Sequence, residues 1–467
     1  MTPQSDSLDF PDSRWPTGPA DFGNFVGIPA APLAPEEEQV EIQVEEPAKE
    51  CPPTPAAEVP PEPAPAPALS FSPQQDEAMV AVKDWLATRS RPVFRLFGYA
   101  GTGKTTIAKH LAQGVSGRVA FAAFTGKAAS VMKRKGCQGA CTIHQLIYTP
   151  LDEDEEKLAQ VRKAIGDATD PIERAALKRQ LDELLKPKFG LSDNAAGRAK
   201  LIVIDECSMV NELIGRDLLS LKVPILVLGD PAQLPPVDGG GFFTDHPADV
   251  LLDQIHRQAE GSGILQLATK VRMRKASMVE IGTFGDEESC VLSKATFEQY
   301  GNPLAFDQVL VGTHKTRRIW SNRIRTLLGR GGFEPVPGDK LVCLRNDHNA
   351  KIMNGELWTC RECVGIDSDT MSLTIESEDQ PGKLKTVTSI RHYFQGRDEE
   401  LKLRPVPGAR FDFGYALTVH KAQGSQWDKV LLINEANAFR RPDSPDTPWR
   451  WLYTGITRAA KQVVVAQ

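Results

Sequence analysis

Short continuous apolar runs alternate with amphipathic segments from about residue 70 onward. Apolar runs of four to six residues are typical of strands buried on both faces of a parallel sheet. The segments between them have the spacing of helices with one apolar face. This alternation predicts a parallel α/β domain. The predicted strands are 93–97, 119–124, 201–204 and 225–228, and the predicted helices are 105–113 and 127–135.

A second alternating pattern follows, with strands predicted at 308–312, 429–433 and 463–465 and a helix at 317–328. We therefore expect two α/β domains, at residues 69–255 and 256–467. Each has an insertion. Residues 150–199 are dense in charge and have helical periodicity, which favours solvated helices over a β-hairpin. Residues 335–410 hold short alternating strands and turns, which predict a small β-barrel.

The chain before the first domain has a different composition. Residues 1–70 hold 16 of the 35 prolines and 13 Asp or Glu against only Arg14 and Lys49. Low hydrophobicity with this charge predicts a disordered, extended tail over residues 1–68. We favour an unattached tail; the alternative is that its few aromatic side chains, such as Phe10 and Trp15, form a short docking segment that orders on a protein partner. The rest of the chain is mildly basic, although the net charge is −6.

No apolar run is long enough to span a bilayer, and the N-terminus lacks a secretory signal pattern. Eight scattered cysteines suit reduced thiols better than a disulfide framework. We therefore expect no membrane association and a cytoplasmic protein, in the host cytoplasm if the chain is phage-encoded. A zinc site from Cys137, Cys141, Cys360 and Cys363 is disfavoured, because the second pair lies in a strand-like stretch.

Residues 98–105, Gly-Tyr-Ala-Gly-Thr-Gly-Lys-Thr, match a nucleoside-triphosphate phosphate loop. They stand where that loop must, after a predicted strand and before a predicted helix. Small residues let backbone N–H groups close around phosphate oxygens, and Lys104 can reach the outer phosphates. The motif predicts ATP as the cofactor. The candidate nucleotide contacts are Gly98, Ala100, Gly101, Thr102, Gly103, Lys104, Thr105 and Thr106.

Two adjacent acids, Asp205 and Glu206, end the apolar run 201–204. They lie at the carboxyl end of a strand, where open α/β sheets bind ligands. Beside a phosphate loop, we expect Thr105 and Asp205 to hold Mg²⁺ and Glu206 to orient and deprotonate the attacking water. A helix cap is the structural alternative for such a pair of acids.

Residues 227–237, Val-Leu-Gly-Asp-Pro-Ala-Gln-Leu-Pro-Pro-Val, resemble the third motif of superfamily 1 helicases. The chain is most similar to the RecD and Dda group of superfamily 1B, whose members move 5′ to 3′ on DNA. The resemblance runs from about Phe71 to the C-terminus as a series of motifs in the family's order. The other matching segments are 71–78, 125–129, 142–145, 252–258, 416–425 and 453–459.

The resemblance implies two RecA-like domains, with an SH3-like barrel as the insertion in the second. It places Gln75 at the adenine and Gln233 as sensor of the γ-phosphate. Arg257 and Arg458 come from the second domain and are expected to act as arginine fingers when the domains close. Gln423 and Gly424 are further expected nucleotide contacts.

Six residues are expected on the nucleic-acid face, because hydroxyl, imidazole and ammonium donors suit phosphates. Phe124 and Trp427 are available for base stacking, although Trp427 is better explained as a core residue. His144 and Lys421 have structural alternatives, as a capping or core histidine and as a solvated surface lysine. The six expected contacts are Thr125, Lys127, His144, Thr418, His420 and Lys421.

The sequence thus predicts an ATP-dependent 5′→3′ DNA helicase that works as a monomer on single-stranded DNA and at junctions with duplex. Its relatives in the group act in replication, repair and recombination. A single-stranded nucleic-acid translocase, on DNA or RNA, with little unwinding is the alternative enzyme. An ATP-gated loading protein is the alternative binding function. Residues 260–467 hold no nuclease constellation, and the element that would split duplex is not identifiable.

Overall fold

The computed structural model describes residues 71–467, apart from short segments. The predicted disordered tail and Arg257 therefore lie outside the described residues. The remaining parts left out are 151–154, 169, 171–172, 175, 178–179, 181–188, 193–198, 236–240, 255–260, 286–288, 348–349, 403–405 and 407.

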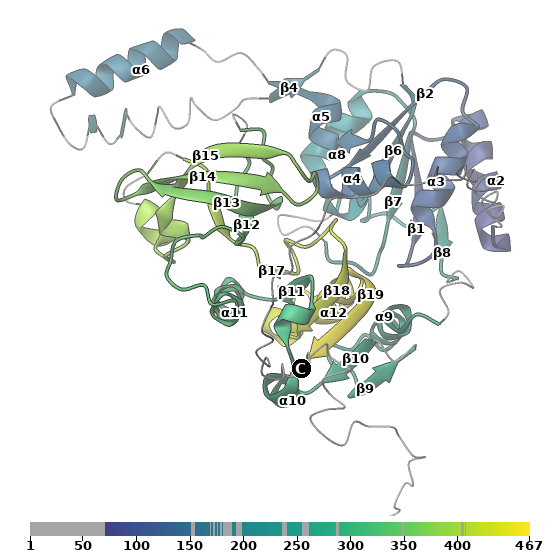
Figure 1. The fold of residues 1–467 in the computed structure, drawn as a ribbon. Coiled ribbons are helices and arrows are strands. Elements are labelled where there is room, and N and C mark those ends of the chain that lie inside the picture. The colour runs from purple at the N-terminus through teal and green to yellow at the C-terminus, as the bar shows by residue number, and fades with distance from the viewer. Residues whose placement is uncertain are drawn as a thin grey trace, which may run out of the picture.

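The first sheet is parallel throughout and has the strand order β3-β2-β6-β7-β1-β8 (Figure 1). Every predicted strand in this part of the chain is present within about one to two residues at each end. The strands are β1 (Val93–Gly98), β2 (Arg118–Ala123), β3 (Cys141–Thr142), β6 (Ala199–Asp205), β7 (Ile225–Gly229) and β8 (Val250–Leu252).

Helices cover both faces of the first sheet and explain why its strands are apolar at every position. One face packs on α2, α3 and α4, and the other on α5 and α8. Helix α2 begins where Ser72 and Gln75 form a capping box and Pro73 takes the first helical position. The helices are α2 (Pro73–Thr88), α3 (Lys104–Gln113), α4 (Gly126–Arg134), α5 (Ile143–Ile147) and α8 (Glu212–Ser220).

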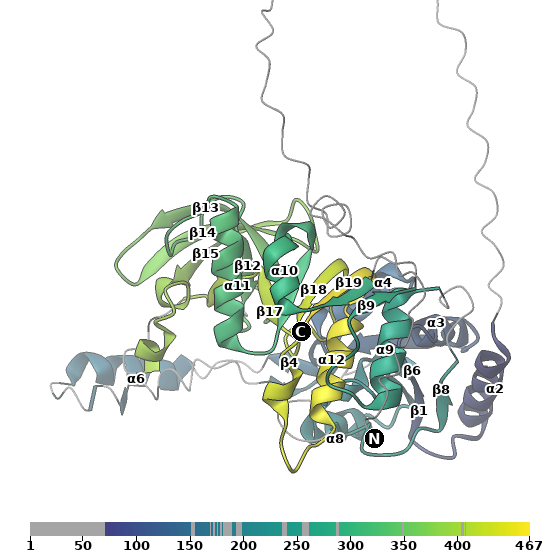
Figure 2. The same cartoon turned by 90° about the horizontal axis from the view of Figure 1, so that it is seen from below.

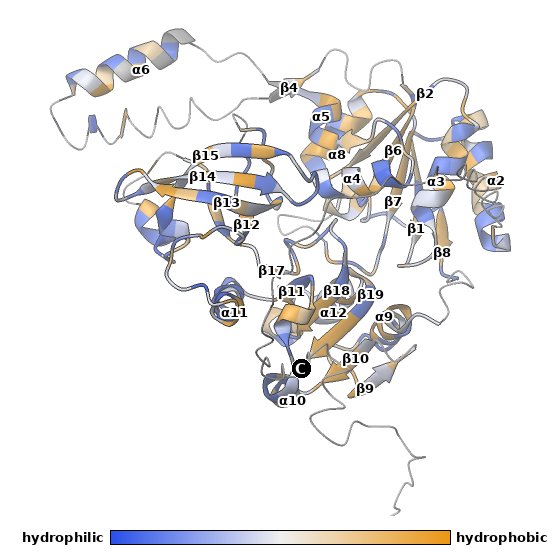
Figure 3. Cartoon of the chain, in the orientation of Figure 1, coloured by the Kyte–Doolittle hydropathy of each residue, from blue (hydrophilic) through white to orange (hydrophobic). Residues whose placement is uncertain are grey.

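The second sheet has the order β17-β11-β18-β19-β10-β9, with only the edge strand β9 antiparallel among its described strands. Figure 3 shows the apolar residues gathered in the central strands of both sheets. Two parallel sheets are therefore confirmed. The strands are β9 (Gly282–Phe284), β10 (Ser289–Leu292), β11 (Gln308–Val311), β17 (Ala416–Thr418), β18 (Trp427–Ile433) and β19 (Ala459–Ala466); the helices are α9 (Gly263–Arg274), α10 (Lys294–Tyr300), α11 (His314–Leu327) and α12 (Thr447–Ile456).

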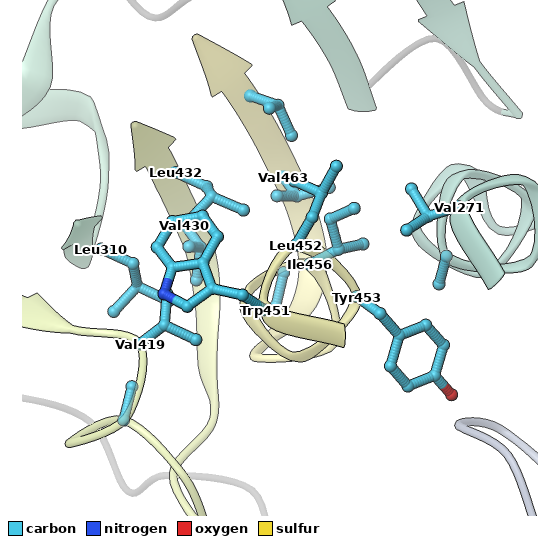
Figure 4. Close-up of a cluster of buried hydrophobic side chains, with 14 of the residues drawn as sticks. Val271, Leu310, Val419, Val430, Leu432, Trp451, Leu452, Tyr453, Ile456 and Val463 are labelled. Carbon is cyan, nitrogen blue, oxygen red and sulfur yellow. The ribbon is translucent and has the colours of Figure 1, made fainter. Parts of the chain in front are cut away.

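The largest apolar cluster of the second sheet includes side chains from the first. Trp451, Leu452 and Ile456 of α12 pack on β18 and β19 (Figure 4). Ala232 and Leu234, from the loop that follows β7 of the first sheet, are buried in the same cluster. The two sheets therefore share part of one core and are not joined by surface contacts alone.

The insertion in the second domain is a five-stranded antiparallel sheet, in the order β15-β14-β13-β12-β16. The chain before β16 returns to β15, where the Ala409 amide donates to Thr388 O at 2.8 Å and the Ile390 amide to Ala409 O at 3.1 Å. These bonds close the sheet into the predicted barrel. Its strands are β12 (Lys340–Cys343), β13 (Leu357–Gly365), β14 (Thr370–Ser377), β15 (Leu384–Ile390) and β16 (Phe411–Phe413).

Buried ion pairs fix the barrel to helix α11. Arg325 Nη2 lies 3.1 Å from Asp339 Oδ2, and both side chains are nearly inaccessible. Arg330 and the Tyr415 hydroxyl also bond to Asp339 Oδ1. A second buried pair joins Arg317 to Asp412. Breaking a buried pair leaves an uncompensated charge, so these contacts hold the barrel in one orientation on the second sheet.

The insertion in the first domain is not helical throughout, contrary to the prediction. Helix α6 (Glu155–Asp167) is present, but β4 (Tyr148–Pro150) and β5 (Phe189–Leu191) pair as an antiparallel ribbon at its base. Figures 1 and 2 both show α6 projecting away from the first sheet. Within the described residues, no helix is long and apolar enough to cross a membrane.

Candidate nucleotide and nucleic-acid sites

The phosphate loop joins β1 to α3 at the carboxyl end of the first sheet. Gly101 and Gly103 both have φ of +79°, a conformation that side chains with a Cβ rarely adopt. Lys104 Nζ lies inside the loop and donates to Gly98 O at 2.6 Å and to Tyr99 O at 3.0 Å. The loop thus has the glycine geometry and the central ammonium that a triphosphate requires.

Gln75 supports this loop from α2. Its Oε1 accepts from the Ser72 amide at 2.9 Å, and its Nε2 donates to Thr102 O at 3.0 Å. Both ends of the amide are therefore engaged with the protein. The adenine contact expected for Gln75 stays a prediction, whereas its role in fixing the loop is visible in the structure.

Thr105 and Asp205 meet at the start of α3 and the end of β6. The Thr105 hydroxyl donates to Asp205 Oδ2 at 2.9 Å. A hydroxyl and a carboxylate are hard oxygen ligands of the kind that Mg²⁺ takes beside phosphates. The residues present therefore fit the expected Mg²⁺ site.

Glu206 follows Asp205 in a left-handed conformation, with φ of 54°, and its amide donates to Asp205 Oδ1 at 2.8 Å. Its side chain is 24% exposed. Burial raises the pKa of the Glu206 carboxyl, and the Arg458 guanidinium opposes this rise. A backbone held in this sparsely populated region is typical of functional sites. Here it fixes the carboxyl beside the phosphate loop.

Arg458 comes from the second sheet and reaches Glu206. Its guanidinium is buried, and Nη1 lies 3.9 Å from Glu206 Oε1. Nε donates to Thr454 O at 3.0 Å, which anchors the side chain on the end of α12. The predicted finger and the predicted base, 252 positions apart in the sequence, are thus neighbours in space.

Gln233 lies between these two charges. With its amide oriented to match its neighbours, Nε2 lies 3.2 Å from Glu206 Oε2 and Oε1 accepts from Arg458 Nη2 at 3.1 Å. An amide is suited to this place because it can donate to a carboxylate and accept from a guanidinium. Gln233 therefore connects the acid of one lobe to the cation of the other.

Tyr453 makes a second connection, which the sequence analysis missed. Its hydroxyl accepts from the Ala100 amide of the phosphate loop at 3.0 Å and donates to Asp230 Oδ2 at 2.7 Å. Burial, together with the Asp230 carboxylate, holds the pKa of this hydroxyl well above its ordinary value, so it keeps the proton that it donates. Figure 4 shows the hydroxyl pointing away from the apolar cluster.

Helix α9 of the second domain also covers the phosphate loop. The Arg272 guanidinium lies 3.6 Å from the centre of the Tyr99 ring, and the Leu265 side chain lies against Gly101. Neither residue was expected at the site, because contacts between segments far apart in the sequence have no local sequence signal. The site is therefore enclosed by both lobes.

Two segments match known protein families. Residues 70–287 match the family described as AAA domain, and residues 413–466 match the UvrD-like helicase C-terminal domain. The ATP-dependent RecD2 DNA helicase of Deinococcus radiodurans is 28% identical over 412 residues, covering 82% of this chain and 48% of the relative. This chain therefore spans about half the length of that relative. The RecBCD enzyme subunit RecD of Mycolicibacterium smegmatis is 23% identical over 446 residues, covering 85% and 70%.

Over most of its length the chain is thus similar to proteins named RecD2 DNA helicase and RecBCD subunit RecD. Among solved structures, a Pif1 helicase from Bacteroides in complex with ADP-AlF3 and ssDNA aligns with a TM-score of 0.46 at 18% identity. That alignment covers 85% of this chain and 92% of the Pif1 chain.

The two residues expected to contact nucleotide from the motif at 416–425 have other partners in the structure. Gln423 Nε2 donates to Leu234 O at 2.9 Å. Gly424 has φ of +72° and lies close to Thr125. A Cβ added to Gly424 would be only 2.4 Å from the Thr125 Oγ1. Their nucleotide contacts stay predictions. The structure instead gives both residues a part in joining the two lobes.

Two expected nucleic-acid residues lie on α4, at the meeting of the first sheet, the barrel and β18. Thr125 caps α4, its hydroxyl accepting from the Ala128 amide at 3.1 Å. Lys127 Nζ lies 4.2 Å from the centre of the Trp427 ring, and burial lowers the pKa of this ammonium. Trp427 is a core residue, 9% exposed, as the sequence favoured. Its ring packs against the Lys127 ammonium.

A second group lies after β17. The buried Thr418 hydroxyl accepts from the Lys421 amide at 3.3 Å. Burial, with Arg317 nearby, lowers the pKa of Lys421 to about 8. Burial also lowers the pKa of His420, whose ring packs 5.3 Å from that of Phe439. Lys421 is therefore not a freely solvated lysine, and it keeps its charge below pH of about 8.

His144 lies apart from that group, on the short helix α5. Thr142 and Gln145 form a capping box there, which gives the residues on either side of His144 a local structural role. The His144 side chain is exposed, and its ring lies 6.2 Å from Phe124 and 5.5 Å from Tyr148. The structure places it on the surface, so its contact with nucleic acid stays a prediction.

Removing one hydroxyl tests the Tyr453 connection. Tyr453→Phe leaves the Ala100 amide and Asp230 without this partner, at a cost of about 1–3 kcal/mol for buried groups. We expect hydrogen exchange at the Ala100 amide to become roughly ten times faster or more. Tyr99→Phe is the matched control, since it keeps the ring beneath Arg272. Equal exchange in both variants would contradict the assigned bond.

Proposed function

We propose that this chain is an ATP-dependent DNA helicase that translocates 5′→3′ along single-stranded DNA and unwinds duplex. One observation carries the proposal. Arg458 of the second lobe lies against Glu206 of the first, beside the phosphate loop. Hydrolysis of ATP builds charge that a cation from the opposite lobe can stabilise, so turnover and the relative position of the lobes are linked.

Each residue at the site has a proposed task. Lys104 binds the outer phosphates, and Glu206 orients the attacking water and accepts its proton. The raised pKa of the Glu206 carboxyl makes it a stronger base than an exposed glutamate. Gln233 reports the γ-phosphate to Arg458, because its amide bridges both charges. Thr105 and Asp205 would hold Mg²⁺, which would neutralise phosphate charge.

The nucleic-acid face is proposed to combine the two groups described above. Lys127 and Lys421 lie on different lobes, and both ammonium groups are partly desolvated. A desolvated cation gains more from a phosphate than a solvated one does. A change in the angle between the lobes therefore alters the spacing of two grips on one strand, which is the requirement for stepping.

The direction of movement is proposed from the resemblance to the RecD and Dda group, and action on DNA from a relative whose name is ATP-dependent RecD2 DNA helicase. A monomer suffices, because one chain supplies both lobes of the site. A translocase with little unwinding is the second candidate enzyme, since no strand-splitting element is assigned among the described residues. An ATP-gated loading protein is less well supported, because a clamp requires neither Glu206 nor Arg458.

Arg458→Ala tests the finger. The change removes the opposite-lobe cation, so we expect ATP turnover stimulated by single-stranded DNA to fall about 10³-fold or more. Binding of a fluorescent ATP analogue is expected to change little, because Lys104 and the loop amides remain. Arg440→Ala, at an exposed arginine of the same lobe, is the control. Equal loss of binding and turnover would contradict the assigned role.

Forked duplexes test direction and unwinding together. We expect strand separation of a duplex with only a 5′ single-stranded tail, at saturating ATP, and at least tenfold less with only a 3′ tail. A blunt duplex and the Lys104→Ala variant are the controls. ATP turnover with displacement of a bound protein but no strand separation would favour the translocase. Preference for the 3′ tail would contradict the proposed direction.

A further inference from the structure

Charge is divided unevenly along the folded part of the chain. Residues 85–151 contain ten Lys or Arg and not one Asp or Glu. Residues 1–70 have the opposite character, with 13 acidic residues against two basic ones. Two oppositely charged stretches of similar length are therefore separated by little more than helix α2.

Part of this positive charge gathers at the end of the first sheet opposite the phosphate loop. Arg118 is the first residue of β2, and Lys133 lies in the last turn of α4, which runs back from the carboxyl end of β2, so both cations are at this end. A Cβ added to Gly136 would lie 2.6 Å from Lys109 Nζ, and one added to Gly117 would lie 2.8 Å from Lys200 Cγ, so each lysine packs on a glycine here. We call this the α3–α4 basic patch; it consists of Lys109, Arg118, Lys133, Arg134, Lys135 and Lys200.

The patch is open to a ligand. All of its members except the half-buried Lys109 are exposed. Across the part of the chain that the structure describes, none of the six forms an ion pair, whereas Arg91 in the same stretch pairs with Asp249 at 3.1 Å. Unpaired exposed cations in such number create a potential that attracts an anionic partner.

The acidic segment joins the fold beside this patch. Phe71, its first described neighbour, packs against His110 of α3, with ring centres 5.0 Å apart. Lys109 is the adjacent residue on that helix. Figures 1 and 2 both show α2 and α3 side by side. The acidic segment is therefore tethered within a few residues of the patch and has a high effective concentration there.

We propose that residues 1–70 dock on the α3–α4 basic patch of the same chain. The Glu-rich run 36–50 lies about 20 to 35 residues from Phe71, and at a limit of roughly 3.3 Å per residue this length of chain is enough to reach the patch. Each side supplies charge that the other lacks. This inference does not depend on the proposed helicase activity.

Docking of this kind shields the chain from other polyanions. The patch lies away from the nucleotide site, so its exposed cations would otherwise bind duplex DNA without regard to sequence or ends. The acidic segment competes with that binding as a mimic of phosphate charge. The competition weakens with added salt, since the pairs are exposed and the Debye length shortens.

Zero-length cross-linking of carboxylates to amines tests the contact directly. In the full chain at about 50 mM salt, we expect a carbodiimide to join acids of residues 36–50 to Lys109, Lys133 or Lys135, as identified by mass spectrometry. Mixing isotopically labelled and unlabelled chains distinguishes contacts within one chain from those between chains. Cross-links within one chain that disappear at about 0.5 M salt support the proposal.

Two double charge reversals distinguish an effect of the patch itself from an effect of the net charge. K133E/K135E is expected to remove most of these cross-links, whereas K383E/K429E, on exposed lysines of the barrel and β18, changes the net charge equally and leaves them in place. Deleting residues 1–68 is expected to tighten binding to blunt duplex DNA about tenfold at low salt. K133E/K135E in the shortened chain is expected to reverse that gain.

Three results would overturn the proposal. One is the absence of cross-links to the patch lysines at low salt. Another is cross-links found only between different chains, which would make the partner a second copy. The third is a duplex affinity that deletion leaves unchanged while K133E/K135E lowers it in the full chain, which would make the patch an open DNA site. None of these measurements uses ATP turnover.

Discussion

The loop after β7 is the constraint on which the two-lobed arrangement depends. It leaves the first sheet, yet it buries Ala232 and Leu234 in the core of the second. The Leu234 amide donates to the Thr454 hydroxyl at 2.9 Å, so its backbone is fixed on α12 as well. Gln233 lies between these two anchors. Any rotation of one lobe on the other must therefore move the amide that touches both Glu206 and Arg458.

Charge balance explains why the site needs both lobes. Asp205, Glu206 and Asp230 lie close enough that the two aspartates further raise the pKa of the Glu206 carboxyl. Lys104 and Arg458 oppose that effect, and Arg458 is the stronger of the two. Withdrawal of the second lobe removes this cation and disfavours the ionised carboxylate. Opening of the lobes thus lowers the ionised fraction of the Glu206 carboxyl and removes the finger in one movement.

The sequence alone was sufficient to predict the elements whose own residues form a recognisable local pattern. Continuous apolar runs located β1, β6 and β7, and the glycine and lysine spacing located the phosphate loop. It failed where the determinant is a contact between distant segments. The Tyr453 hydroxyl and the Ala100 amide are 353 positions apart, and Arg272 reaches Tyr99 from another domain. The β4–β5 ribbon was missed because three-residue strands have too few positions to reveal a period.

A double-mutant cycle between Gln233 and Arg458 measures the coupling of the lobes most directly. ATP turnover stimulated by single-stranded DNA is compared in the Gln233→Ala and Arg458→Ala variants and in the chain that has both changes. If the two residues act as one unit, the double variant is about as slow as the slower single variant. Reductions in kcat that multiply would show independent action and contradict a shared site between the lobes.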